Sequence, residues 1–208
     1  MRTTFLTVVL LSAGTTLFAG PLTGLFNTGV DAFGVPLVGA NVPDPHYVIT
    51  SSPGAGVSNI TPVTFNCCYF ADGPNSRWIS VNANGNNAGS GTYLFELTFS
   101  LAGLDPASAV ITGQFAADNH STIKLNGVTV PGSTNTFGSY TSFTINSNFI
   151  AGSNKLDFVV VDDAAPMALR VNSLAGTANP VSGVPEPSTV GLILSGLVAM
   201  SVRQFRKR

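Results

Sequence analysis

The sequence predicts an all-β fold, a single antiparallel β-sandwich of jelly-roll type. Gly and Pro together number 35 of the 208 residues, so turn formers are abundant and helix formers are scarce. Short runs of alternating apolar and polar residues recur along the chain, and no segment outside the two chain ends shows a helical period. Eight or nine short strands separated by turn residues are typical of a sandwich.

The clearest predicted strand covers residues 92–100, because Tyr93, Phe95, Leu97 and Phe99 alternate with mostly polar residues. Such alternation indicates a strand with one buried face. Further strands are expected at 109–115, 123–125, 142–145, 155–161 and 168–172, with less distinct ones at 47–50, 63–65 and 77–81.

A tight hairpin is predicted where Asn126-Gly127 separates Ile123 and Leu125 from Val128 and Val130. Asn-Gly favours a type I′ turn, whose two central residues have positive φ. The flanking apolar residues should therefore pair across the turn.

The first 19 residues have the layout of a secretory signal peptide. Arg2 precedes an apolar run at 5–11, and small residues follow around Ala19. The run is too short for a membrane-spanning helix, which needs about 20 apolar residues. We expect cleavage near Ala19 and a sandwich domain over residues 20–178.

The last 30 residues are expected to form a linker, 179–187, followed by an apolar helix with a basic tail, 188–208. The motif is Val184-Pro185-Glu186-Pro187-Ser188, and the apolar stretch 190–202 carries no charge. The cations after it are Arg203, Arg206, Lys207 and Arg208. Prolines keep the motif extended, and positive charges favour the cytoplasmic side of a transmembrane helix. An ordinary C-terminal anchor fits the same charge and length.

This tail resembles the PEP-CTERM sorting signal. The resemblance implies that an exosortase, a membrane-embedded cysteine transpeptidase-like enzyme, recognises the Pro-Glu-Pro triplet and removes the helix. The chain is then expected to cross the inner membrane, to be held there by its C-terminal helix before processing, and to reach the cell surface or the extracellular space.

The charge content argues against nucleic-acid binding. Only 9% of the residues are charged, against a usual value of about 25%. Between Gly20 and Gly183 four cations stand against nine carboxylates, a formal charge of −5. A mildly acidic domain lacks the basic footprint that nucleic acids require.

The two cysteines are neighbours, Cys67 and Cys68. Three states are open from the sequence: two buried thiols, a vicinal disulfide, or a bridge to another molecule. None of them makes a metal site.

The central region resembles the galactose-binding-like jelly rolls. The residues that carry this resemblance are Ala116-Ala117-Asp118-Asn119, 123–127, 149–158 and Leu169-Arg170-Val171, with 26–31, 44–47 and 76–79 upstream. Such domains accompany many glycoside hydrolases, so the resemblance implies possible carbohydrate binding.

Tyr69 and Tyr140 are the candidate glycan contacts, because both lie near predicted turns and an exposed aromatic ring can stack on a sugar. Trp78 and Tyr93 are expected in the core. A calcium ion at Asp162-Asp163 is an alternative to two solvated carboxylates. Asp118-Asn119 should shape a turn through side-chain hydrogen bonds.

Catalysis is not expected. His46 and His120 are the only histidines and are interpreted as ordinary loop residues, and no nucleophile elbow is present. Glu96 lies on the polar face of a strand with no sign of a partner carboxylate across a cleft.

We therefore expect no cofactor and a non-enzymatic surface or matrix protein that binds exopolysaccharide. The alternatives are an adhesive protein without a small ligand and, third, an exported hydrolase.

Overall fold

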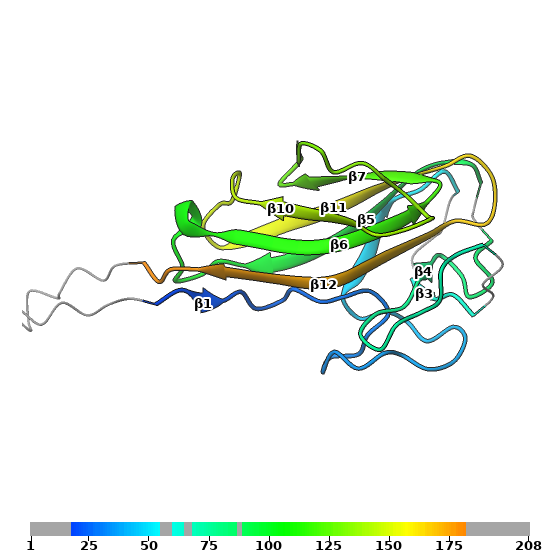
Figure 1. Cartoon of the computed structure of the whole chain (residues 1–208), viewed down its shortest axis with the longest axis horizontal. Coiled ribbons are helices and arrows are strands. Elements are labelled where there is room, and N and C mark those ends of the chain that lie inside the picture. Colours follow the sequence, from blue (N-terminus) through cyan, green and yellow to red (C-terminus); the bar gives the residue numbers. More distant parts are fainter. Residues whose placement is uncertain (1–17, 55–59, 65–67, 87–88, 182–208) are drawn as a thin grey trace, which may run out of the picture.

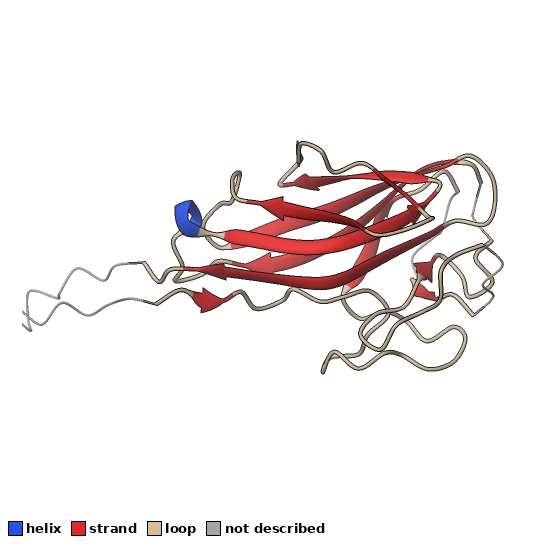
Figure 2. Cartoon of the chain, viewed as in Figure 1, coloured by secondary structure: helices blue, strands red, loops and turns tan. Residues whose placement is uncertain are grey.

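The structure is a computed structural model that describes residues 18–54, 60–64, 68–86 and 89–181. These residues form a two-layer β-sandwich (Figures 1 and 2). The strands are β1 (Gly20–Pro21), β2 (Tyr47–Ser51), β3 (Thr61–Pro62), β4 (Ile79–Ser80), β5 (Gly91–Ser100), β6 (Val110–Asp118), β7 (His120–Leu125), β8 (Val128–Thr129), β9 (Asn135–Thr136), β10 (Thr141–Ile145), β11 (Ser153–Asp162) and β12 (Ala168–Ala178). A 3-10 turn, η1 (Pro106–Ser108), precedes β6.

Each layer is one antiparallel sheet. Sheet A has the order β10-β6-β12-β4-β3, with β1 on β12, and sheet B has the order β2-β5-β11-β7-β8, with β9 on β7. From β4 to β7, and again from β10 to β12, successive strands alternate between the two sheets. This arrangement confirms the predicted jelly-roll sandwich.

The core lies between the sheets and is rich in aromatic rings. Tyr93, Phe95, Leu97 and Phe99 of β5 are all buried, as their alternation predicted. Phe158 of β11 is at the centre, with its ring 5.9 Å from that of Phe115 and 6.3 Å from that of Phe143. Rings at these separations and angles attract one another beyond the area they bury.

The predicted hairpin is confirmed. Leu125 of β7 pairs with Val128 of β8, and Asn126 and Gly127 both have positive φ, 51° and 82°. Both central residues of a type I′ turn require this conformation.

Two of the less distinct strands were misplaced. The strand expected at 63–65 lies instead at β3 (Thr61–Pro62), and Phe65 lies outside the described residues. The strand expected at 77–81 shortens to β4 (Ile79–Ser80), because Arg77 and Trp78 belong to a loop that is held by side chains.

Strand β12 is longer than the strand that was predicted at 168–172. The alternation of side chains between the two faces breaks after Asn172, so the strand was expected to end there. The structure has a bulge at Ser173, whose φ is 53°, and the pairing with β6 resumes at Ala175. A bulge adds one residue to a strand and so inverts the apparent alternation.

Candidate functional site

The outer surface of sheet A carries a group of uncharged polar side chains. It is made by Thr112 and Gln114 of β6, Ser142 and Thr144 of β10, and Asn172 and Ser173 of β12; we call these six residues the polar face. They point outward because Ile111, Phe115, Phe143 and Val171, their neighbours along the strands, point into the core. Successive side chains of a strand alternate between its two faces.

The strand register places these side chains in rows. Thr144 lies opposite Thr112, and Ser142 lies opposite Gln114. On the other side of β6, Asn172 lies opposite Gln114. Residues directly opposite in antiparallel strands have Cβ atoms about 5 Å apart, so one row holds Ser142, Gln114 and Asn172 side by side.

A shallow hollow of about 290 Å³ lies on this surface. Thr112, Gln114, Ser142, Thr144 and Ser173 line it, together with Gly113 and Phe143. Gly113 is required here for space, because a Cβ atom on it would come within 2.8 Å of the Phe143 ring. The glycine lets the Phe143 ring pack directly beneath β6 and leaves the outer side to hydroxyl and amide groups.

The hydrogen bonds within the row are long. Gln114 donates from Nε2 to Ser142 Oγ at 3.5 Å, and Asn172 donates from Nδ2 to Gln114 Oε1 at 3.5 Å. Hydrogen bonds of this length are weak compared with the usual 2.9 Å. Gln114 and Ser142 therefore keep much of their capacity to bond to a ligand, whereas Asn172 is already bonded more closely to Ser173 Oγ at 3.1 Å and to Ser76 Oγ at 3.2 Å.

An aromatic cluster borders the polar face at one end. Tyr140, which precedes β10, is half-buried, and its ring centroid is 4.8 Å from that of Phe70. The Arg170 guanidinium lies 5.2 Å from the Phe70 centroid and 5.4 Å from the Tyr140 centroid. These distances are within the range of a cation–π interaction.

Arg170 also fixes the loop that carries Phe70. It donates from Nε to Ser76 Oγ at 3.0 Å, from Nη2 to Ser76 O at 3.1 Å and from Nη1 to Ala71 O at 2.6 Å. Burial lowers the pKa of Arg170 from its ordinary value, while Tyr140 and Asp72 oppose that change. Since an arginine stays protonated in proteins, the loop rests on a buried cation that is only 3% exposed.

Ser76 connects this support to the polar face. Its Oγ is 3.3 Å from the Tyr140 hydroxyl, and it donates to Asn172 Oδ1 at 3.2 Å. The position of Asn172 in the row is therefore coupled to Arg170 through one serine.

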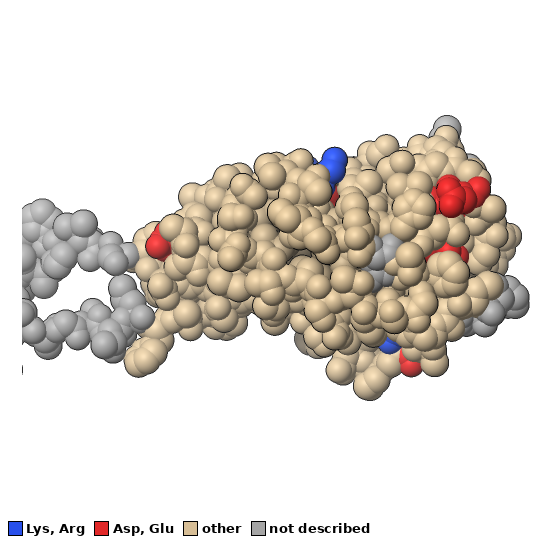
Figure 3. All heavy atoms as spheres, turned by 45° about the horizontal axis from the view of Figure 1, so that its top comes forward, with Lys and Arg blue, Asp and Glu red and all other residues tan. Residues whose placement is uncertain are grey.

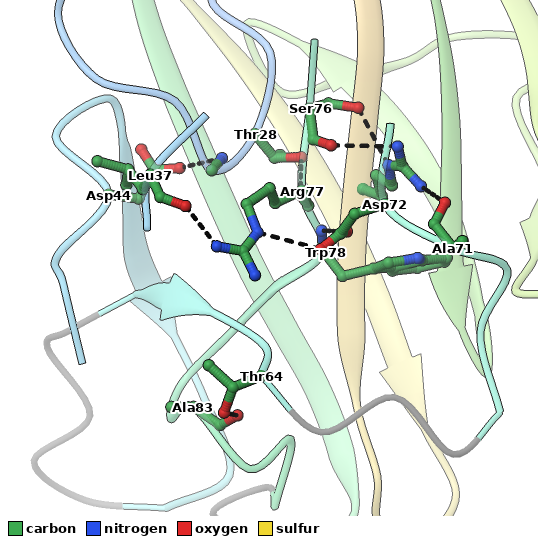
Figure 4. A network of polar contacts seen from close by, with 12 residues as sticks. Thr28, Leu37, Asp44, Thr64, Ala71, Asp72, Ser76, Arg77, Trp78 and Ala83 are labelled. Atoms are coloured by element: carbon green, nitrogen blue, oxygen red, sulfur yellow. Dashed lines mark hydrogen bonds and ion pairs between the residues drawn. The ribbon is translucent and has the colours of Figure 1, made fainter. Parts of the chain in front are cut away.

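A second arginine holds the base of the same loop. Arg77 donates from Nε to Asp72 Oδ2 at 3.0 Å and from Nη1 to the carbonyl of Leu37. The other oxygen of Asp72 accepts from the backbone N–H of Trp78 at 3.0 Å. Figure 4 shows these contacts side by side, so the loop between Tyr69 and Trp78 is fixed by two guanidinium groups.

The two predicted glycan contacts differ in exposure. Tyr140 lies at the edge of the polar face and is partly exposed. The expectation of an exposed Tyr69 ring is wrong: Tyr69 is 8% exposed. Its ring stacks on Trp78 with 4.5 Å between centroids, so it supports the cluster from below.

Trp78 and Tyr93 are buried, which confirms the core prediction. Trp78 donates from Nε1 to Phe70 O at 2.9 Å, and Tyr93 donates from its hydroxyl to Gly89 O at 2.7 Å. Each ring thus buries its apolar body and satisfies its polar end.

The structure does not bring the titratable candidates together. His46 stacks on Phe26, with ring centroids 3.5 Å apart, and its Nε2 lies 2.9 Å from Asp31 O. His120 is exposed at the start of β7, and Glu96 pairs with Lys155 on sheet B at 3.0 Å. These residues lie on separate elements, and His46 and Glu96 make contacts within the domain.

Acidic side chains gather at the end of the sandwich where β6 and β11 stop; Figure 3 shows acidic atoms concentrated toward one end of the visible surface. Burial raises the pKa of Asp118 to about 6, a hydrogen bond from Tyr69 lowers it, and Asp162 and Asp163 raise it. Asp163 is exposed, whereas Asp162 is buried. In the described ranges, no three His, Cys, Asp or Glu residues are placed to hold a metal ion.

Asn119 Oδ1 accepts from Asp163 N at 2.7 Å, so this side chain ties the turn after β6 to the end of β11, in place of the hydrogen bond within the turn that was predicted. Cys68 is disulfide-bonded and exposed, which is not the state of a buried thiol; Cys67 lies outside the described residues.

Residues 1–17 of the predicted signal peptide and the sorting residues 184–208 also lie outside the described residues. Within the part that is described, no helix is long and apolar enough to cross a membrane.

Sequence reasoning missed the polar face. The outward positions of 142–145 and 168–172 were readable from their alternation, but the neighbourhood of Gln114, Ser142 and Asn172 depends on strand order. Nothing in the sequence states that β6 lies between β10 and β12.

No protein-family model and no curated protein matches the chain. Among solved structures, the CBM36-1 domain of a multidomain xylanase from the hindgut metagenome of Trinervitermes trinervoides is similar at 15% identity, covering 66% of this chain and 98% of that one, with a TM-score of 0.35. The CBM35 from Paenibacillus barcinonensis gives 14% identity, coverage of 65% and 99%, and a TM-score of 0.34.

A Stig cyclase, Fisc from Fischerella sp. TAU, is similar at 10% identity, with coverage of 75% and 98% and a TM-score of 0.40. These solved structures include binding modules and an enzyme, and the similarities are too low to assign a ligand to this chain. The chemistry of the polar face has to carry the functional conclusion.

Proposed function

We propose that this chain is a non-enzymatic, exported protein whose polar face binds an uncharged polysaccharide. The observation that carries the proposal is the row Ser142, Gln114 and Asn172, three uncharged hydrogen-bonding side chains side by side on an outer sheet surface. The hollow that Gln114 and Ser142 of this row line supplies about 290 Å³ of space.

The chemistry of the face matches that of a neutral sugar chain. Hydroxyl and amide groups donate and accept hydrogen bonds, as sugar hydroxyls do, and none of the six side chains of the polar face is charged. Tyr140 offers a partly exposed ring at the edge of the row, where it can contact the apolar face of a sugar. Because the hollow is shallow and buries little of a ligand, weak binding is expected.

A binding measurement with matched variants tests this proposal. Gln114→Ala combined with Thr144→Ala removes two hydrogen-bonding groups from the hollow without changing the core. At about 1 kcal/mol for each hydrogen bond, the Kd for a bound neutral polysaccharide should rise about thirtyfold. Thr98→Ala, on the outer surface of sheet B, is the control and should leave the Kd unchanged.

Affinity electrophoresis in gels that contain neutral or acidic polysaccharides gives the readout. Equal retardation of the double variant and the wild type would place the ligand elsewhere on the molecule. No retardation by any polysaccharide would favour the adhesive protein without a small ligand.

We further propose that both chain ends act in export, with cleavage after the signal segment and removal of the tail by an exosortase. The Pro-Glu-Pro motif and the order of apolar and basic segments support this step. Gly20 pairs with Ala178, so the two ends of the described domain leave it at the same pole (Figure 1). Such a domain can stay folded outside while either end is processed.

The intact mass of the protein from hosts with and without an exosortase tests the sorting step. Wild-type protein should lose the apolar segment only in the first host, and Glu186→Ala should keep it in both. A wild-type product that still carries residues 190–208 in both hosts would show that the tail is only a membrane anchor, and the proposed sorting step would be wrong.

A further inference from the structure

The loop of residues 31–38 exposes apolar side chains. Phe33 is 90% exposed, Val38 86% and Val35 57%. From Ala32 to Ala40 the sequence contains no polar or charged side chain. The loop projects from the side of the domain near β3 and β4, as the blue segment that follows β1 in Figure 1.

The tip of the loop is a fixed turn. The Asp31 carboxylate accepts from the N–H groups of Phe33 and Val35 at 2.8 and 2.9 Å. Asp31 N donates to Val35 O at 2.8 Å and Gly34 N donates to Asp31 O at 3.0 Å. Gly34 has a φ of 80°, which favours glycine at this point.

The base of the loop is tied to the body of the domain. Leu37 N donates to Gly29 O at 2.8 Å, and Gly29 N donates to Asp44 Oδ2 at 2.7 Å. Arg77 donates to Leu37 O, and His46 Nε2 contacts Asp31 O. Phe33 is therefore presented on a rigid support, so little conformational entropy is lost when it meets a partner.

We propose that the Phe33 loop inserts into the interfacial layer of a lipid bilayer. Lipid offers no hydrogen-bonding partners, so a segment that enters it must satisfy its own backbone groups. The N–H groups of Asp31, Phe33, Gly34 and Val35 are already bonded within the turn. A convex apolar tip with an aromatic residue suits the bilayer interface, where aromatic side chains collect.

Charge indicates the kind of lipid surface. The ionic groups nearest the contact are Asp31 in the turn itself and Asp44 and Arg77 at the base of the loop, and all three are already bonded within the protein. The contact is therefore apolar and needs no anionic lipid. This separates it from binding by basic clusters, which depends on anionic headgroups.

The chain outside the described residues places a membrane within reach. The apolar segment that begins at Val190 is expected to enter a bilayer, and eight residues separate it from Val181. Extended, they span at most about 28 Å. One weak apolar contact holds a protein at a membrane poorly, whereas two such signals together suffice. The loop would thus hold the domain on its side against the bilayer while the tail is present.

Tryptophan fluorescence of the full chain tests this contact. The chain has one tryptophan, Trp78, which is 1% exposed and gives a constant background. Phe33→Trp adds a reporter at the loop, and Val128→Trp adds one at β8, where Val128 is 48% exposed. Both variants are mixed with phosphatidylcholine vesicles, with and without bromine on the acyl chains, and vesicle binding is followed by flotation.

The expected result is that both variants float with the vesicles, while only Phe33→Trp shifts to shorter wavelength and is quenched by the brominated lipid. An unshifted Phe33→Trp on floating vesicles overturns the proposal, and so does the failure of both variants to float. A shift without vesicles that grows with protein concentration would assign the loop to a contact between copies of the chain.

Discussion

The outer surfaces of the two sheets are both formed by antiparallel strands, but sheet B presents charged side chains and sheet A presents uncharged polar ones. On sheet B, Lys155 and Glu96 form an ion pair at 3.0 Å, and Asp157 lies opposite both Glu96 and Lys124. On sheet A the corresponding positions hold Thr112, Gln114 and Ser142. On sheet B one charged pair, Lys155 and Glu96, is bonded within the protein, whereas on sheet A Gln114 bonds to its neighbours only at 3.5 Å and remains available for a ligand.

The ion pair on sheet B adds little to stability. Exposed ion pairs contribute about 0 to 1 kcal/mol to the free energy of unfolding. Burial raises the pKa of Asp157, and Glu96 raises it too, while Lys155 and Lys124 lower it. On sheet A the charged group is buried instead of exposed: Arg170 lies beneath the surface and supports side chains that are uncharged.

The largest expected effect comes from the core residue on which both sheets depend. Phe158→Ala should lower the free energy of unfolding by about 3 to 5 kcal/mol, because a large ring leaves a cavity. Denaturant titration measures the change. A midpoint close to that of the wild type would contradict the packing of Phe158 against Phe115 and Phe143.

Arg170→Met should have the next largest effect. The free energy of unfolding should fall by about 2 to 3 kcal/mol, because the carbonyl oxygens that accept hydrogen bonds from the guanidinium lose their charged donor. The matched change on the other sheet, Lys155→Met, should cost at most about 1 kcal/mol. Equal losses for the two variants would remove the distinction between a buried support and a surface pair. Binding of polysaccharide should weaken only in Arg170→Met, because Ser76 and Asn172 lose their anchor.

The smallest effect concerns the acidic end. Asp118 has a pKa of about 6 in the folded protein, raised from 3.8. The folded state therefore holds a proton that the unfolded state has lost, and stability must fall as the pH rises from about 4 to 6. Asp118→Asn should remove this fall and stabilise the protein by about 1 to 3 kcal/mol above pH 7.

Thermal unfolding at pH 4, 6 and 8 shows whether the stability of Asp118→Asn relative to the wild type increases as the pH rises. A constant difference across these pH values would mean that Asp118 titrates normally. The polar face contains no ionisable group, so its binding should stay constant over the same range.

Much of the fold followed from the sequence, because period-two alternation sorts residues between the core and the outside. Tyr93, Phe95 and Leu97 were placed correctly on this ground, and Asn126-Gly127 specified its turn. The pattern failed at Ser173, where a bulge adds one residue, and around Arg77, where side chains hold a loop in place of a strand.

The candidate site could not be predicted in the same way. Gln114, Ser142 and Asn172 come from three strands whose order is a property of the whole fold. Tyr69 was misjudged because a turn position suggests exposure, whereas stacking on Trp78 buries the ring. Tyr140 keeps part of its ring exposed because it borders the polar face at the edge strand, where sheet A ends.

The place of β12 within sheet A has a mechanical consequence. The last described strand runs between β6 and β4 and pairs with β6 over most of its length. In a chain held by its C-terminal end, tension would pull β12 along its own axis and load its hydrogen bonds to β6 together. A pull through the edge strand β2 would instead separate its bonds to β5 one after another, and single-molecule force measurements with the two attachment points would show the difference. We therefore expect the domain to withstand more tension when it is pulled through β12 than when it is pulled through β2.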